Sequence, residues 1–157
     1  MNIRFMTEAD VPKAALVHQL AFVRQQNSLE WLQCSLNAFP RFFSFVAELN
    51  NEVVGYILWA QKSGFRHEVI LELEQLAVLP ESQGNGIGRK LIDESLPLVK
   101  EQLVLKSATL KHIVVTTRAD NVAQRLYKST LGAKVETTIS NLYSADEVIM
   151  IARNVNF

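Results

Sequence analysis

Short runs of alternating or β-branched residues recur along the chain, and such runs are typical of strands. They predict seven strands, at residues 2–6, 41–49, 53–61, 68–78, 110–117, 135–139 and 148–155. Asn50 and Asn51 separate the second and third of these strands and favour a tight hairpin turn. The last two strands are expected to form a closing antiparallel pair.

Hydrophobic residues spaced three and four apart indicate helices between the strands. Four helices are predicted, beginning near residues 7, 28, 87 and 121. Thr7 and Ser28 are suited to cap the first two helices, and Gly132 is a natural stop for the fourth. Pro97 is expected to kink or end the third helix. The order of strands and helices predicts one mixed α/β domain over residues 1–157.

The composition fits a globular protein, because 48% of the 157 residues are hydrophobic and 20% are charged. Sixteen Lys and Arg balance sixteen Asp and Glu, so we expect no global basic field for nucleic acid. The longest apolar runs are far too short to span a membrane, and the first residues lack the apolar core of a signal peptide. These features predict a cytoplasmic protein with no membrane partner.

Cysteine and histidine are scarce in this chain. Cys34 is the only cysteine, which excludes an intrachain disulfide, and its apolar surroundings in sequence predict a small buried side chain. The three histidines are widely spaced, and we expect no metal site.

The segment that carries the clearest chemical signal follows the strand at 68–78. Glycines at positions 84, 86 and 88 lie in a polar loop that opens the third helix. Glycine adopts positive φ and lets a ligand approach the backbone, while a helix N-terminus presents unpaired N–H groups and a partial positive charge. Together these features predict a cradle for phosphate groups. The loop lacks the Gly-Lys-Ser/Thr ending of a P-loop and the spacing of a dinucleotide fingerprint.

Two segments resemble the signatures of the GNAT superfamily of acyl-CoA-dependent N-acetyltransferases. Gln83-Gly-Asn-Gly-Ile-Gly88 resembles the Q/R-x-x-G-x-G/A motif, and Leu76-Ala-Val-Leu-Pro80 is similar to its usual lead-in. Asn121-Val-Ala-Gln-Arg-Leu-Tyr127, followed by Gly132-Ala133, resembles the N-x-x-A-x-x-L-Y-x-x-x-G-F segment. The order of predicted elements matches this family over nearly the whole chain.

The resemblance implies a mostly antiparallel, twisted sheet of about seven strands flanked by about four helices. It also implies a splayed pair of strands, 71–78 and 110–117, that admits coenzyme A. The protein would use acetyl-CoA as cosubstrate and an amine as acceptor, without a metal. Residues 1–157 would form a single N-acetyltransferase domain.

Roles for individual residues also follow from the resemblance. Leu76, Ala77 and Val78 would offer backbone groups to the pantetheine arm of the cofactor. Asn121 and Tyr127 would lie near the pantetheine end. The residues that would wrap the pyrophosphate are Gln83, Gly84, Asn85, Gly86, Ile87, Gly88 and Arg89.

The second segment departs from the family pattern in its spacing. Asn121 lies six residues before Tyr127 rather than seven, and Gly132 lies five residues after it rather than four. One local shift of register would explain both differences, and it affects the direction in which Tyr127 points. Ala133 also stands where the family usually has an aromatic residue.

Acetylation of an amine calls for a base, because most alkylamines are protonated at neutral pH. Glu72 and Glu74 lie on the strand that leads into the cradle, on one face by strand alternation, and both resemble the family's common base position. We favour Glu74, which is nearer the expected splay. Tyr127 is the candidate acid for the leaving thiolate. The alternatives are two solvated carboxylates and a tyrosine packed in the core.

The acceptor is less clear from the sequence. The tail from Asn141 to Met150 is faintly similar to that of ribosomal-protein N-terminal acetyltransferases, but the glutamate that those enzymes carry two residues before Arg118 is Thr116 here. A peptide amine such as an N-terminus, a polyamine and a small-molecule amine all stay open. The prediction is direct transfer of an acetyl group in a ternary complex. The alternatives are a non-catalytic acyl-CoA-binding sensor and a structural or interaction module with a fortuitous glycine loop. A homodimer is compatible with each of these.

Overall fold

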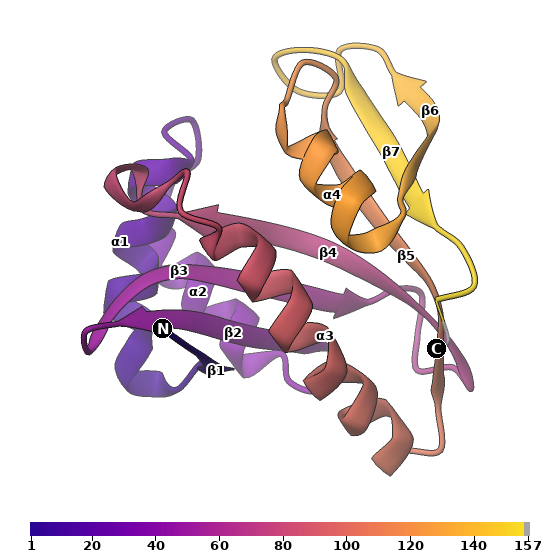
Figure 1. Cartoon of the computed structure of the whole chain (residues 1–157), viewed down its shortest axis with the longest axis horizontal. Coiled ribbons are helices and arrows are strands. Elements are labelled where there is room, and N and C mark those ends of the chain that lie inside the picture. The colour runs from indigo at the N-terminus through magenta and orange to yellow at the C-terminus, as the bar shows by residue number, and fades with distance from the viewer. Residues whose placement is uncertain (156–157) are drawn as a thin grey trace. The chain divides into compact units, whose positions relative to one another are not determined.

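The structure is a computed structural model, and it describes residues 1–155 (Figure 1). The strands are β1 (Asn2–Phe5), β2 (Phe42–Leu49), β3 (Glu52–Gln61), β4 (Glu68–Val78), β5 (Thr109–Arg118), β6 (Lys134–Ile139) and β7 (Glu147–Ala152). The helices are α1 (Val11–Ala21), α2 (Ser28–Asn37), α3 (Ile87–Leu105) and α4 (Ala123–Leu131), with short 3-10 turns at Glu8–Asp10 and Pro80–Ser82. The predicted mixed α/β class is therefore confirmed.

The strands form one sheet in the order β1-β2-β3-β4-β5-β7-β6. Pairing is antiparallel between β1 and β2, between β5 and β7, and between β6 and β7, as predicted for a mostly antiparallel sheet. β4 and β5 pair in parallel, with partners from Glu68↔Thr109 to Glu72↔Val114. The chain divides into two compact units. The N-terminal unit comprises residues 1–59 and 75–99, and the C-terminal unit comprises residues 60–74 and 100–155.

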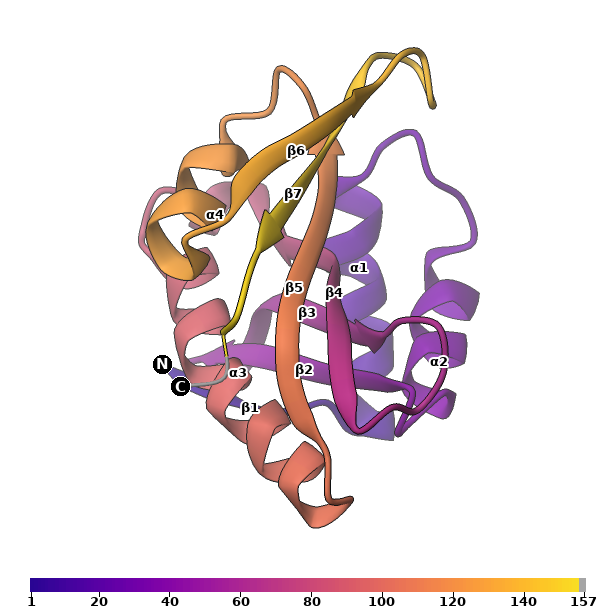
Figure 2. The ribbon, with the colours of Figure 1, turned by 90° about the vertical axis from the view of Figure 1, so that its right-hand side faces the viewer.

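In the N-terminal unit, helices cover both faces of β2 and β3 (Figures 1 and 2). On one face, Val17 of α1 and Leu32 of α2 join Tyr56 of β3 in a buried apolar cluster. On the other face, the Trp59 indole of β3 donates a hydrogen bond to the hydroxyl of Ser95 in α3 at 2.8 Å, and both side chains are fully buried. This packing supports the end of β4 and the start of α3, where the phosphate cradle was predicted.

In the C-terminal unit, β7 lies between β5 and β6, and α4 runs beside these strands (Figure 2). The register of β5 and β7 runs from Ile113↔Ala152 to Arg118↔Glu147. Side chains of β5 alternate between a buried row and a half-exposed row, so residues two apart share a face. The residues that lie opposite each other in this register therefore share a face as well.

Local signals in the sequence account for several element ends. Asn50 and Asn51 have φ values of 51° and 63°, as the predicted tight turn between β2 and β3 requires. Gly132 has a φ of 69° and ends α4. Thr7 begins the 3-10 turn that precedes α1, where the Asp10 carboxylate accepts hydrogen bonds from the Thr7 N–H at 2.8 Å and hydroxyl at 3.0 Å.

Two local expectations differ from the structure. Of the two outcomes expected at Pro97, an end of the helix is wrong, because α3 continues to Leu105, and a kink stays a prediction. A proline in a helix interior costs about 3 kcal/mol, and burying Leu96, Val99 and Leu103 along the same helix offsets that cost. Cys34 is exposed rather than buried, because the buried positions of α2 lie on a face that excludes it.

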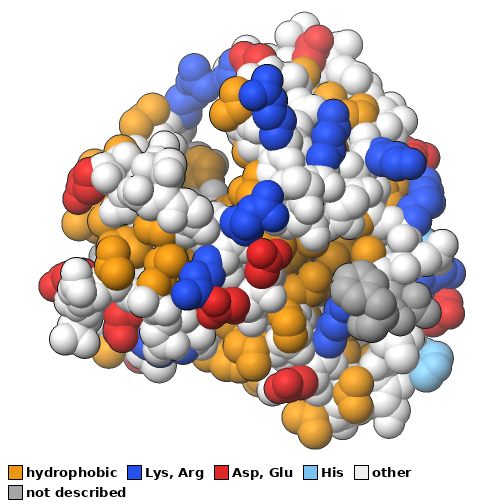
Figure 3. Space-filling model, in the orientation of Figure 1, with side chains coloured by type: hydrophobic (Ala, Val, Ile, Leu, Met, Phe, Trp, Pro, Cys, Tyr) orange, Lys and Arg blue, Asp and Glu red, His pale blue; other side chains and the backbone are white. Residues whose placement is uncertain are grey.

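The C-terminal end of α3 carries hydrophobic side chains on the surface. Val104 and Leu105 are 68% and 78% exposed, and Figure 3 shows hydrophobic side chains at this end of the helix. No described helix is both long and apolar enough to cross a membrane.

Candidate functional site

The loop Gln83–Arg89 joins the end of β4 to α3 in the N-terminal unit. Gly84 and Gly86 have φ values of 80° and 78°, in the left-handed region that side chains disfavour, so both positions require glycine. Apart from buried Ile87, residues 83–87 are exposed. Within residues 1–155, none of the N–H groups of residues 84–88 donates a hydrogen bond. These amides are therefore available to an anion at the start of a helix.

The loop is fastened to the strand that precedes it. The Gln83 side-chain amide donates to the Val78 carbonyl at 3.1 Å, which engages one of the backbone groups predicted to face the pantetheine arm. β3 approaches the same stretch closely at Gly55, where a Cβ atom would lie only 2.9 Å from the Ala77 carbonyl oxygen. The backbone around Ala77 and Val78 is thus held from both sides, as a binding loop on a rigid scaffold requires.

β4 presents two distinct rows of side chains. The buried row is Val69, Leu71, Leu73, Gln75 and Ala77, and the half-buried row is Ile70, Glu72, Glu74, Leu76 and Val78. Glu72 and Glu74 therefore share a face, as strand alternation predicts. The Glu72 carboxylate forms an ion pair with Lys62 at 2.9 Å, so one of its oxygens is engaged within the chain.

Tyr127 of α4 is only 6% exposed. Burial raises the pKa of its phenol to about 12, so the hydroxyl keeps its proton at neutral pH. The hydroxyl has no hydrogen-bond partner among the described residues. Its oxygen is not fully enclosed by the protein, so a ligand can reach it. A protonated phenol with a free and accessible hydroxyl has the properties of a proton donor.

Asn121 has a local structural task. Its side-chain N–H donates to the Thr117 hydroxyl at 3.0 Å, and its side-chain oxygen accepts from the Ala123 N–H at 2.9 Å. The residue thus forms an Asx turn just before Val122, the N-cap of α4, and ties this turn to the end of β5. This local role explains an asparagine at position 121 without a ligand, and contact with the cofactor stays a prediction.

A polar network centred on Gln75 lies in the N-terminal unit and was not predicted from the sequence. Gln75, in the buried row of β4, accepts hydrogen bonds from the Trp31 indole at 2.9 Å and the Tyr56 hydroxyl at 2.7 Å. Its amide donates to the Gln25 oxygen at 3.1 Å, and that oxygen also lies 2.8 Å from Nε2 of buried His18. An indole N–H can only donate, so it fixes the orientation of both amides and puts a proton on that Nε2. The signal in the sequence was Gln75 itself, a polar residue at a position of β4 where the alternation predicts a buried apolar side chain.

Glu147, at the start of β7, is a second buried polar residue that was not predicted from the sequence. The residue is only 7% exposed, and its Oε2 atom is fully enclosed without a hydrogen-bond partner. Burial raises the pKa of this carboxyl. No local pattern in the sequence marks Glu147 as buried, because its surroundings depend on how β7 pairs with β5 and β6.

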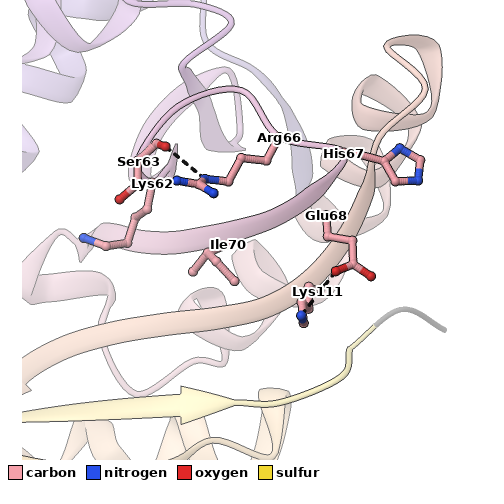
Figure 4. Close-up of a pocket in the computed structure, with 7 residues that line it drawn as sticks. All are labelled: Lys62, Ser63, Arg66, His67, Glu68, Ile70 and Lys111. Atoms are coloured by element: carbon pink, nitrogen blue, oxygen red, sulfur yellow. Dashed lines mark hydrogen bonds and ion pairs between the residues drawn. The ribbon is translucent and has the colours of Figure 1, made fainter.

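Two hollows of the surface lie outside the predicted site residues. One, of about 620 Å³, is formed by the β3–β4 connection and the starts of β4 and β5 (Figure 4). It is lined by Lys62, Ser63, Arg66, His67, Glu68, Ile70 and Lys111. Lys111 is paired with Glu68 at 3.2 Å, and Arg66 donates to the Ser63 carbonyl at 2.9 Å. Its cations are thus largely engaged within the chain.

The other hollow, of about 580 Å³, lies between α1 and α2 in the N-terminal unit. Uncharged residues line it: Pro12, Ala15, Leu16, Gln19, Gln25, Gln26, Asn27, Ser28 and Leu29. Among residues 1–155, no group of three or more His, Cys, Asp or Glu side chains could hold a metal ion.

Comparison with known proteins agrees with this arrangement of elements. Residues 14–133 match the acetyltransferase (GNAT) family. An uncharacterised N-acetyltransferase of Methanocaldococcus jannaschii is 30% identical over 120 residues, which cover 75% of this chain and 70% of that protein. The L-amino acid N-acyltransferase MnaT of Escherichia coli is 32% identical over 123 residues, covering 66% of this chain and 68% of the relative.

A solved structure extends the likeness to the whole fold. The ribosomal-protein-alanine N-acetyltransferase of Brucella melitensis superposes with a TM-score of 0.78 at 26% identity, covering 98% of this chain and 99% of that one. The fold and the glycine loop thus define an acyltransferase of the GNAT type. The chain belongs to the GNAT acetyltransferase family.

Proposed function

We propose that the protein transfers an acetyl group from acetyl-CoA to a primary amine of a small molecule or a peptide, in a ternary complex without a covalent enzyme intermediate. The observation that carries the proposal is the loop Gln83–Arg89, with left-handed Gly84 and Gly86 and undonated amides before α3. A pyrophosphate is the anion that such a cradle suits. Membership of the GNAT family supports acetyl-CoA as the molecule that carries it.

The chain's own groups divide the binding task. The amides of residues 84–88 would hold the pyrophosphate, with Gln83, Asn85 and Arg89 at the rim of the loop. Backbone groups of Leu76, Ala77 and Val78 would contact the pantetheine arm, and Asn121 would complete that end. Acetyl-CoA supplies the acetyl group as a thioester.

Proton transfer falls to side chains of the C-terminal unit. Glu74 would take a proton from the ammonium form of the acceptor, which frees the nitrogen lone pair for attack on the thioester carbon. Glu72, which forms an ion pair with Lys62, is the second candidate for this base, and we favour Glu74 because it lies nearer the end of β4 that leads into the cradle. As the C–N bond forms and the C–S bond breaks, Tyr127 would give its proton to the leaving thiolate, a task that suits a phenol protonated at neutral pH.

Thermal unfolding with and without acetyl-CoA tests the binding step. A ligand present at a hundred times its Kd adds about 2.7 kcal/mol to the folded state, which raises the melting temperature by several degrees. Gly86→Glu should abolish this rise, because it places a side chain at positive φ and a negative charge in the cradle.

Gly64→Glu is the matched control for that variant. Gly64 also has a positive φ, 102°, and a Cβ atom at either glycine would have nothing within 4 Å. It should therefore carry the same strain and charge outside the cradle, and keep the response to acetyl-CoA. Equal responses in both variants would overturn the cradle. Release of free thiol from acetyl-CoA with a panel of amines then separates turnover from binding alone.

A further inference from the structure

Glu147 is a buried carboxyl that the protein itself does not satisfy. It is 7% exposed, and no described residue donates a hydrogen bond to either of its oxygens. Oε2 is fully enclosed by the protein, whereas Oε1 is not. The carboxyl is therefore desolvated on one side and open on the other.

The cation nearest in register does not neutralise this carboxyl. Arg118 of β5 lies directly opposite Glu147 in the antiparallel pairing. Its guanidinium instead binds Asp120 at 3.0 and 3.2 Å and the Ser144 hydroxyl at 3.2 Å. On the other side, β6 places uncharged Ile139 opposite Glu147. The charged groups that act on Glu147 are thus Arg118, which favours its anion, and Asp120, which opposes it.

The strand register places Glu147 on the face that carries the predicted base residues. Arg118 and Thr116 share a face of β5, and so does Val114, which is the parallel partner of Glu72. Glu147 lies opposite Arg118, four residues along β5 from Val114, or about 13 Å at the rise of a strand. Glu72 and Glu147 are therefore on one face but too far apart to share a proton.

A buried carboxylate without a donor is costly, because its lost hydration is not replaced. It becomes favourable only when it takes up a proton or when a cation binds to it. A primary ammonium group suits this place, since one of its three N–H groups can donate to the open carboxylate oxygen and the other two remain for neighbouring acceptors. The Thr116 hydroxyl, on the same face and without a partner among the described residues, offers a second acceptor.

We propose that the Glu147 carboxylate, through its open oxygen, binds the ammonium group of the acceptor before acetyl transfer. This inference rests on the proposed function and narrows the acceptor to amines that arrive as cations. Glu147 is then the residue at which the acceptor's ammonium group binds first, and the ammonium group must leave Glu147 and reach Glu74 or Glu72 before its proton is removed.

The test compares Glu147→Gln with the wild type in steady-state kinetics and in amine binding. The probes are n-butylamine, 1,3-diaminopropane and a peptide with N-terminal alanine. Loss of a hydrogen bond to a charged group should raise the KM for the amine about ten- to a hundredfold and leave the KM for acetyl-CoA unchanged. Without acetyl-CoA, the best of these amines should raise the melting temperature of the wild type but not of the variant, and n-butanol should raise neither.

Glu136→Gln is the matched control, because Glu136 on β6 is exposed and paired with Arg153. It removes the same charge from the same unit and should leave both KM values unchanged. An unchanged KM for the amine in Glu147→Gln, or an equal rise in Glu136→Gln, would overturn the inference. If the wild type acetylates no amine, the proposed function fails, and the amine-induced shift in melting temperature still decides whether Glu147 binds ammonium.

Discussion

Gln75 and Glu147 are both polar side chains buried at strand positions, but they meet opposite surroundings. In the N-terminal unit, Gln75 accepts two hydrogen bonds and donates a third. In the C-terminal unit, Glu147 receives none from the described residues. The difference indicates that the two residues do different work, because a saturated buried network stabilises a fold while an unsatisfied buried group destabilises it.

This contrast separates structure from function within one chain. The hydrogen bonds of Gln75 join β4 to α2 through Trp31 and to the α1–α2 connection through Gln25, so its role is to hold elements together. The Glu147 carboxylate joins no two elements by a hydrogen bond among the described residues, and a buried charge that lowers stability in this way is typical of a group that serves function. Substitutions at the two positions should therefore have opposite effects on stability.

The largest effect on stability is expected for Gln75→Leu. This change leaves the buried Tyr56 hydroxyl and the indole N–H of Trp31, a residue that is 37% exposed, without their acceptor, and the buried hydroxyl alone costs about 1–3 kcal/mol. The melting temperature should fall by about 5–10 °C, as measured by circular dichroism. Gln26→Leu, at an exposed glutamine of the α1–α2 connection, is the control and should change it little. Equal melting temperatures for Gln75→Leu and the wild type would show that the network contributes nothing.

The next effect has the opposite sign. Glu147→Gln should make the free protein more stable than the wild type at neutral pH, by a few degrees in melting temperature. Burial raises the folded-state pKa of Glu147, so the folded state binds the proton more tightly than the unfolded state. The wild type therefore loses stability, relative to the variant, as pH rises from about 4.3 through that raised pKa.

Melting curves at a series of pH values check this sign. Below about pH 3 the carboxyl is protonated in both states, and the difference between wild type and variant should no longer depend on pH. Glu136→Gln, which removes an exposed ion-paired carboxylate, should show no such trend. A Glu147→Gln protein that is less stable than the wild type at pH 7 would indicate that the carboxylate has a structural partner.

The two regions also differ in how far the sequence predicts them. The cradle depends on residues that are neighbours in the chain, and two of its three glycines, Gly84 and Gly86, have positive φ, whereas Gly88 in the first turn of α3 does not. The hairpin turn at Asn50 and Asn51 also depends on neighbours in the chain. The chemical roles assigned to the cradle, Glu74 and Tyr127 rest on family resemblance and stay predictions.

Features that depend on pairing between distant segments were not predicted. Glu147 is buried by the register of β7 against β5 and β6, which no local pattern reveals. Gln75 meets Gln25 across 50 residues of chain. The continuation of α3 past Pro97 has the same origin, because the packing along α3 outweighs a local preference for ending the helix there. Sequence periodicity shows which face of an element is buried but not what that face contacts.

A smaller effect is expected where the network of Gln75 reaches the surface. Gln25→Ala removes the acceptor shared by Gln75 and His18, while the hydrogen bonds of Trp31 and Tyr56 stay in place. The free energy of unfolding should fall by about 1 kcal/mol. Hydrogen exchange should rise in residues 22–27, since the tether to β4 is lost. Gln26→Ala changes the neighbouring exposed glutamine and should leave both measurements unchanged.

The smallest effect on stability is expected for Glu72→Gln, and it sharpens the contrast with Glu147. Glu72 forms its ion pair with Lys62 near the surface, where such pairs contribute about 0–1 kcal/mol. The free energy of unfolding should therefore change by less than about 1 kcal/mol, without the gain expected for Glu147→Gln. If Glu74 is the base, Glu74→Gln should lower kcat and alter the pH profile of kcat/KM, while Glu72→Gln should not. The reverse result would assign the base to Glu72, and its ion pair with Lys62 would then have to open during turnover.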